Sequence, residues 1–133
     1  RAMSYWQDYS FEEKIKNILK EAAHVGKASD ISGKPFMSVY QIALEFNRLF
    51  AEDVKNMGYE VSSAVVPGNK SLPQYIAMQL SRRIKKGEIK GIEEVMLSHL
   101  YGDKLLLKQG EESYEVQLTE AKTNRLLYRY NEQ

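Results

Sequence analysis

The chain has 133 residues, of which 43% are hydrophobic and 28% charged, the size and composition of one soluble globular domain. It has no cysteine and two histidines, which excludes disulfides and cysteine nucleophiles and argues against a multi-histidine metal centre. Nineteen Lys and Arg residues stand against 18 Asp and Glu residues, so the net charge of +1 creates no overall field that attracts nucleic acid.

The first residues of the chain are rich in aromatic side chains. Tyr5, Trp6 and Tyr9 lie within ten residues, and a disordered tail seldom carries so many aromatics. We therefore expect the arm formed by residues 1–9 to pack on its own domain or on a partner chain.

No sequence feature suggests export or a membrane partner. The N-terminus shows no basic region followed by an apolar stretch, and no apolar run approaches the roughly 18 residues of a membrane span. We expect Met3 to be the natural start, with Arg1 and Ala2 left over from a tag, and a cytoplasmic location.

The first predicted helix follows this arm. Ser10 is the expected N-cap, and Glu13, three residues later, completes a capping box. Apolar residues recur at spacings of three and four, which is typical of an amphipathic helix, and Gly26 is its expected end.

Two further amphipathic helices are predicted, separated by a segment without a clear period. The second helix of the chain begins with a capping box formed by Ser38 and Gln41 and runs without a break to Gly58. The third begins at Ser71 as N-cap and ends at Gly87.

The last third of the chain changes period from helix to strand. Residues 95–97, 104–107 and 114–118 are predicted strands, and in the third of them apolar and polar residues alternate. The polar residues 109–112 supply a turn between the second and third strands, which indicates a β-hairpin. Residues 119–127 are predicted to form a short final helix.

These elements predict an α+β fold in a single domain over residues 1–133. A three-helix N-terminal part precedes a small antiparallel sheet with a β-hairpin and a short C-terminal helix. The aromatic arm is 1–9, the mainly helical part 10–87, and the hairpin with the terminal helix 88–133.

Positive charge gathers at the end of the third helix. Between residues 71 and 90 there are five cations and one acid, Glu88, a local net charge of +4. Cations are favoured at the negative end of a helix dipole, which explains part of this pattern. Their density also predicts contacts with phosphates, and the five cations are Arg82, Arg83, Lys85, Lys86 and Lys90.

The order of the predicted helices and the hairpin resembles that of a known superfamily. A helix opened by Pro35-Phe36-Met37-Ser38, a helix ending in Ser81-Arg82-Arg83-Ile84-Lys85-Lys86-Gly87, and a hairpin together resemble the winged helix-turn-helix superfamily from Phe36 to Leu118. The resemblance implies a positioning helix, a recognition helix and a β-hairpin wing with its tip at residues 108–112, acting on double-stranded DNA. It places the DNA-facing side chains at Gln74, Gln79, Ser81, Arg82 and Arg83, with Lys85, Lys86 and Lys90 beside them.

A second interpretation is a protein-interaction or homo-oligomerising module. The chain has nine tyrosines, four phenylalanines and one tryptophan, residue types that serve interfaces well. Both chain ends are aromatic, and the expected interface residues of a homodimer are Trp6, Tyr9, Tyr128 and Tyr130.

A third interpretation is a small-ligand site or hidden enzyme beneath residues 59–70. No assembled catalytic motif supports it, because the paired carboxylates are adjacent in sequence and point apart, while His24 and His99 have no suitable neighbours. Gly33-Lys34-Pro35 and Gly68-Asn69-Lys70-Ser71 lack the spacing of a phosphate-binding loop. We therefore expect a non-enzymatic protein without a cofactor or metal.

Overall fold

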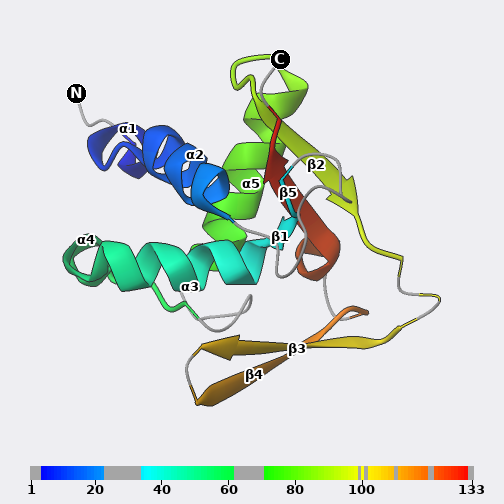
Figure 1. Ribbon diagram of the computed structural model, residues 1–133. Helices are drawn as coiled ribbons and strands as arrows, with labels where there is room; N and C mark the ends of the chain where they lie inside the picture. Colours follow the sequence, from blue (N-terminus) through cyan, green and yellow to red (C-terminus); the bar gives the residue numbers. More distant parts are fainter. Residues whose placement is uncertain are drawn as a thin grey trace.

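The computed structural model describes residues 4–22, 34–61, 71–98, 100, 102–109, 111–119 and 122–131. It confirms the mixed α+β architecture. Helices occupy one side of the molecule in Figure 1, a three-stranded sheet lies on the other side, and a two-stranded hairpin lies below them.

Two N-terminal helices pack together. They are α1 (Tyr5–Asp8) and α2 (Phe11–Glu21), so the predicted aromatic arm is itself partly helical. The capping box predicted at Ser10 is wrong. Ser10 has a left-handed backbone (φ 52°) because it links α1 to α2, with its N–H bonded to the carbonyl of Gln7 at 3.3 Å, and its side chain makes no cap hydrogen bond. The predicted end at Gly26 lies outside the described residues.

The long second helix is divided into two. The capping box at Ser38 is confirmed: its hydroxyl accepts the N–H of Gln41 at 3.1 Å, and the Gln41 side chain accepts the Ser38 N–H at 2.8 Å. Helix α3 (Val39–Leu49) ends at Phe50, whose backbone leaves the helical region (φ −131°, ψ 48°). Helix α4 (Ala51–Met57) follows. It ends at Gly58, as predicted, in a left-handed conformation (φ 77°).

The third predicted helix is α5 (Leu72–Lys85). Ser71 is confirmed as its N-cap, since the Ser71 hydroxyl accepts the N–H of Gln74 at 3.2 Å. Pro73 lies in the first turn, where no N–H donor is needed. The helix gives way to a turn at Gly87, whose left-handed backbone (φ 76°) strains any other residue.

The C-terminal segment differs most from the prediction. A 3-10 helix, η3 (Lys122–Arg125), replaces the expected final helix over residues 119–127, and β5 (Leu126–Tyr130) follows it. Strand β5 is central in an antiparallel sheet of order β1-β5-β2, with β1 (Met37–Ser38) and β2 (Ile92–Met96) at its edges. The predicted final helix is wrong. Strand β5 is stabilised by hydrogen bonds to β1 and β2, which are distant in sequence, and a local sequence pattern does not reveal such partners.

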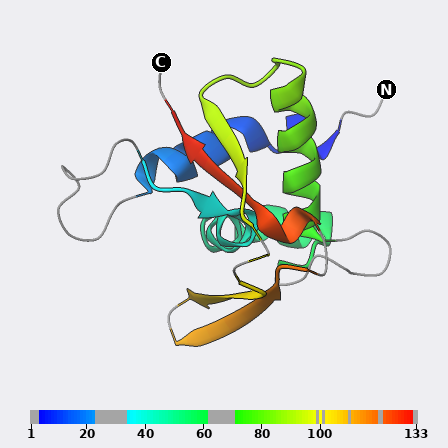
Figure 2. The same ribbon diagram turned by 90° about the vertical axis from the view of Figure 1, so that its right-hand side faces the viewer.

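The predicted hairpin is confirmed as strands β3 (Lys104–Gln109) and β4 (Glu112–Gln117). It forms a separate two-stranded sheet and lies beside α3 in Figures 1 and 2. Leu107 and Val116 are buried in the core, so the hairpin packs on the body of the domain.

Asn124 joins the hairpin to the rest of the molecule. Its side chain is buried between η3, α3 and β4. The Tyr40 hydroxyl donates to Asn124 Oδ1 at 2.5 Å, and Asn124 Nδ2 donates to the carbonyl of Gln117 at 2.6 Å. One amide side chain therefore connects a helix of the body with a strand of the hairpin.

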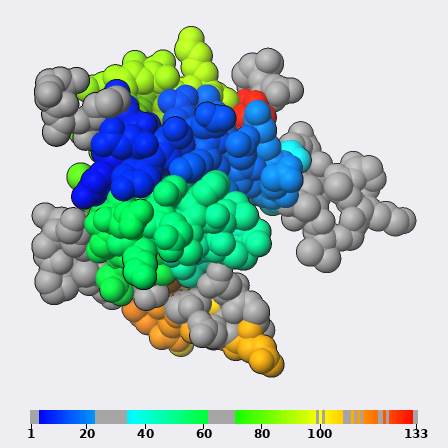
Figure 3. All heavy atoms as spheres, turned by 90° about the vertical axis from the view of Figure 1, so that its left-hand side faces the viewer, coloured from blue at the N-terminus to red at the C-terminus, as the bar shows by residue number. Residues whose placement is uncertain are grey.

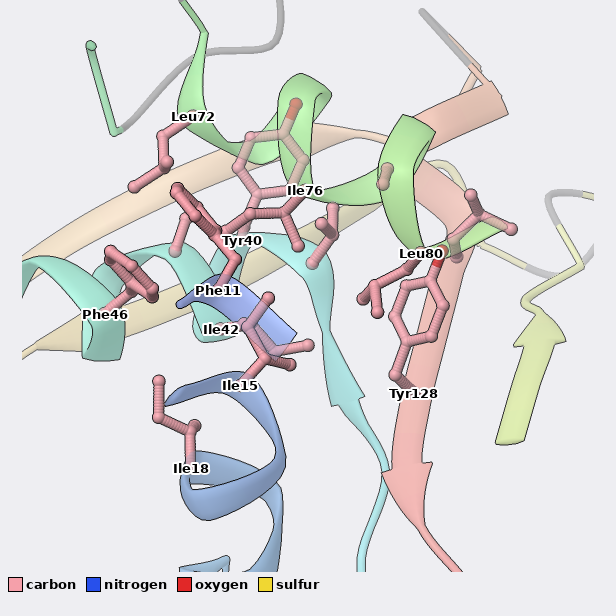
Figure 4. Close-up of a cluster of buried hydrophobic side chains, with 14 of the residues drawn as sticks. Phe11, Ile15, Ile18, Tyr40, Ile42, Phe46, Leu72, Ile76, Leu80 and Tyr128 are labelled. Atoms are coloured by element: carbon pink, nitrogen blue, oxygen red, sulfur yellow. The ribbon is translucent and has the colours of Figure 1, made fainter. Parts of the chain in front are cut away.

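The core lies between α2, α3, α5 and β5, as Figure 4 shows. A column of stacked rings runs through it: the Trp6 and Phe11 centroids are 5.4 Å apart, and those of Phe11 and Phe46 are 4.7 Å apart. Figure 3 shows α1 and α2 lying across one face of the molecule, above α3 and α4. The described part of the N-terminal arm, residues 4–9, thus contributes to the core through Trp6 and Tyr9.

A second aromatic group gives the protein a predicted pH dependence. Tyr59 stacks on Tyr75 at 5.3 Å, and burial raises the pKa of Tyr59 to about 12 from 10.0. The neutral phenol favours the folded state, so this contribution is complete below pH 10 and is lost as the pH rises towards 12. Urea unfolding over this range should show a smaller loss of stability in Tyr59→Phe than in the wild type. Equal losses in the two proteins would contradict this assignment.

Candidate functional site

Helix α5 presents a polar outer face because its apolar side is fixed in the core. Leu72, Ile76 and Leu80 are fully buried. The opposite side carries Met78, which is 55% exposed, and the exposed Arg82. The helix is thereby oriented so that much of its last turn faces solvent.

Arg83 is directed towards its own chain. Its guanidinium carbon lies 5.2 Å from the Trp6 ring, its Nη1 donates to Glu88 Oε1 at 3.1 Å, and its Nε donates to Gln79 Oε1 at 3.0 Å. That Arg83 and Gln79 face DNA stays a prediction, but both side chains already have partners within the chain. Trp6 and Glu88 hold the guanidinium, and Gln79 bonds to it, so both side chains are used within the domain.

Arg83→Ala is expected to lower the free energy of unfolding by about 1–2 kcal/mol, because it removes a cation–π contact and a charge-assisted hydrogen bond. Arg82→Ala should change stability by less than about 0.5 kcal/mol, as is typical of surface positions. Denaturant unfolding of both variants measures the difference. Equal stabilities would show that the contact of Arg83 with Trp6 contributes nothing.

The other four predicted cations remain exposed at this end of α5. Arg82 Nη2 donates to Gln79 Oε1 at 2.9 Å, and Lys85 lies one turn further along the helix. Lys86 and Lys90 belong to the turn between Lys85 and β2. None of the four forms an ion pair with a carboxylate in the described parts of the chain. We call Arg82, Lys85, Lys86 and Lys90 the basic end of α5.

The remaining predicted DNA-facing residues lie elsewhere or have other contacts. The Ser81 hydroxyl donates to Glu94 Oε1 at 3.4 Å, towards the sheet. Gln74 is half-buried in the first turn of α5, about 16 Å along the helix axis from Lys85 at 1.5 Å per residue. The structure therefore does not bring Gln74 together with the basic end.

The hairpin lies far from the basic end. Strands β3 and β4 occupy one end of the molecule in Figures 1 and 2, while the turn after α5 lies at the opposite end. The antiparallel pair that follows α5 is β2 with β5, and the hairpin is inserted between these two strands in the sequence. The predicted wing tip at 108–112 therefore does not adjoin the basic end.

The predicted interface aromatics pack mostly within this chain. Trp6 is only 3% exposed and Tyr128 is fully buried, with its hydroxyl donating to Glu94 Oε2 at 2.6 Å. Burial and Glu94 both raise the pKa of Tyr128. Tyr9 and Tyr130 are half-buried against the core. Trp6 and Tyr128 cannot form an exposed interface in this fold, because their partners are in the same domain.

No described feature supports the predicted pocket beneath residues 59–70, of which 62–70 lie outside the described residues. A hollow of about 500 Å³ lies instead on α1 and α2. Its walls carry both signs of charge, with Glu12 and Lys16 paired across one helical turn at 3.0 Å. This mixture favours no single class of ligand.

The described residues form neither a membrane span nor a metal-binding cluster. No helix among them is long and apolar enough to cross a bilayer. No group of three or more acidic or histidine side chains in the same residues is arranged to hold a metal ion.

Comparisons with protein families, with curated proteins and with solved structures found no match for this chain.

Proposed function

We propose that this protein binds double-stranded nucleic acid through the basic end of α5. The observation that carries the proposal is the exposure of Arg82, Lys85, Lys86 and Lys90 on one helix end, without an ion pair to any described carboxylate. Cations placed together in this way neutralise neighbouring phosphates and release their counterions. Because the net charge of the whole chain is only +1, the attraction to phosphates would come from this cluster and not from the protein as a whole.

The order of elements supports a winged-helix-like interpretation. Helices α3 and α4 take the place of a positioning helix, and α5 that of a recognition helix. The antiparallel strands β2 and β5 follow α5, so their connection takes the place of the wing and contains the hairpin β3–β4. Two features depart from that pattern, the division of the positioning helix at Phe50 and the inserted hairpin.

The proposed contacts are mainly with phosphates. Of the five side chains that the resemblance places towards DNA, Gln79, Ser81 and Arg83 form hydrogen bonds within the chain. Phosphate contacts position a protein on a duplex but carry no sequence information. We therefore expect weak sequence preference and strong salt dependence.

A pair of matched double variants tests the site. Lys85→Ala with Lys86→Ala removes two cations from the basic end, and Lys34→Ala with Lys55→Ala removes two exposed lysines outside it. The first pair should weaken binding to a fluorescent 20-base-pair duplex by about tenfold or more at low salt. The second pair, with the same net charge, should bind like the wild type. If both double variants weaken duplex binding equally, the effect depends only on the overall charge of the protein, and the proposed site is rejected.

A further inference from the structure

Strand β2 has an open edge. It pairs with β5 on one side, and no described strand pairs with its other side. The N–H of Leu97 donates to the carbonyl of Arg125 at 2.7 Å, and the carbonyl of Gly91 accepts the N–H of Asn131 at 2.8 Å. Backbone N–H and C=O groups alternate in direction along an antiparallel strand. Since those of residues 91 and 97 point towards β5, the backbone groups of residues 92, 94 and 96 point away from it. The outward groups belong to Ile92, Glu94 and Met96.

An apolar hollow lies at the end of this edge. It has a volume of about 160 Å³, and Met78 of α5 and Leu126 of β5 both line it. Leu126 is the cross-strand partner of Met96, so the hollow lies beside the end of β2. Met78 and Met96 are 55% and 49% exposed, and flexible methionine side chains suit an adaptable binding surface.

The charges around this hollow favour an acidic partner. Lys122 lines it, and Arg82 lies one helical turn from Met78 on α5; neither is paired with a carboxylate in the described residues. The two acids of β2 are already engaged. Glu93 pairs with Arg129 at 3.0 Å, and Glu94 accepts the Tyr128 hydroxyl.

We propose that the open edge of β2 binds an extended acidic segment of a partner protein by strand addition. The segment's backbone bonds to the outward groups of β2, an aliphatic side chain enters the hollow between Met78 and Leu126, and carboxylates meet Lys122 and Arg82. Figure 2 shows β2 and α5 on the face that would receive the segment. The surface shares Arg82 with the basic end of α5 but does not include Lys85, Lys86 or Lys90, and the inference does not depend on nucleic-acid binding.

The probe is a fluorescein-labelled octapeptide in which a leucine has glutamates two residues away on each side, with threonines between. Alternate residues of a strand share a face, so the leucine and glutamates would all face α5. A matched peptide with lysine in place of each glutamate is the charge control. Anisotropy titration should show at least tenfold tighter binding of the glutamate peptide.

Three variants separate the backbone contact from the charge contact. Met96→Pro removes an outward N–H without removing a β2–β5 hydrogen bond, which an edge strand tolerates. It should abolish peptide binding, whereas Met96→Ala should retain most of it. Lys122→Glu should reverse the preference towards the lysine peptide. Thermal unfolding of each variant verifies that it is folded.

Duplex affinity distinguishes this inference from the proposed function. Met96→Pro changes no residue of the basic end and no charge, so it should bind the duplex within about twofold of the wild type. The strand-addition proposal is overturned if the two peptides bind the wild type equally, or if folded Met96→Pro binds the glutamate peptide as well as Met96→Ala does.

Discussion

Replacing Trp6 with alanine is expected to lower the free energy of unfolding by about 3–5 kcal/mol, the usual cost of removing a large buried aromatic side chain. Trp6 is 3% exposed, stacks on Phe11 at 5.4 Å, and supports the guanidinium of Arg83. Its loss leaves a cavity at the junction of α1, α2 and α5. Chemical denaturation gives the change, together with a large fall in the thermal midpoint.

Tyr5→Ala is the matched control from the same short helix. Tyr5 is 36% exposed and lies at the edge of the aromatic group, so its replacement should cost well under half as much. A different result would support the interpretation in which Trp6 belongs to a homodimer interface. In that case Trp6→Ala would be as stable as the wild type and would differ only in self-association, measured by light scattering.

Asn124→Ala is expected to lower the free energy of unfolding by about 2–4 kcal/mol. It removes the hydrogen bonds that Asn124 makes with the buried Tyr40 hydroxyl and with the Gln117 carbonyl, and loss of a partner at a buried polar group costs about 1–3 kcal/mol. Because Asn124 connects α3 with β4, amide hydrogen exchange should accelerate most strongly in β3 and β4.

The exposed Asn56 in α4 provides the control for that experiment. Asn56→Ala should leave both stability and hairpin exchange within experimental error of the wild type. A uniform acceleration across all elements in Asn124→Ala would mean that the residue stabilises the whole domain without a specific link to the hairpin.

Local sequence signals predicted helix ends correctly where the cap residue has the backbone conformation usual for its type. Ser38 and Ser71 cap helices as expected, and Gly58 and Gly87 end them. The same reasoning failed at Ser10, because a preceding short helix forces it into a left-handed conformation that the sequence pattern does not reveal.

The three-stranded sheet was largely hidden from the sequence. Strand β1 has only two residues, too few for a period, and β5 lies between β1 and β2, its partners from distant parts of the chain. Because those partners are far away in sequence, the local pattern after residue 119 predicts a helix. The hairpin was predictable because its strands are neighbours in sequence and are joined by a polar turn.

The cluster of positive charges can be predicted from the sequence, but which cations are bound within the chain and which are exposed cannot. Arg82 and Arg83 are adjacent, yet only Arg83 reaches Trp6 and Glu88. That difference arises from the position of α1 against the end of α5. Likewise, the aromatic ends of the chain appeared free only because their packing partners are far away in sequence.

The salt dependence of duplex binding tests the central claim most directly. Each phosphate neutralised contributes a slope of about −0.9 to the logarithm of the affinity against the logarithm of the salt concentration, so four cations at the basic end predict about −3.6. Replacing Arg82, Lys85, Lys86 and Lys90 together with alanine should bring the slope close to zero. Absence of duplex binding at the lowest salt, or an unchanged slope in this variant, would contradict the account.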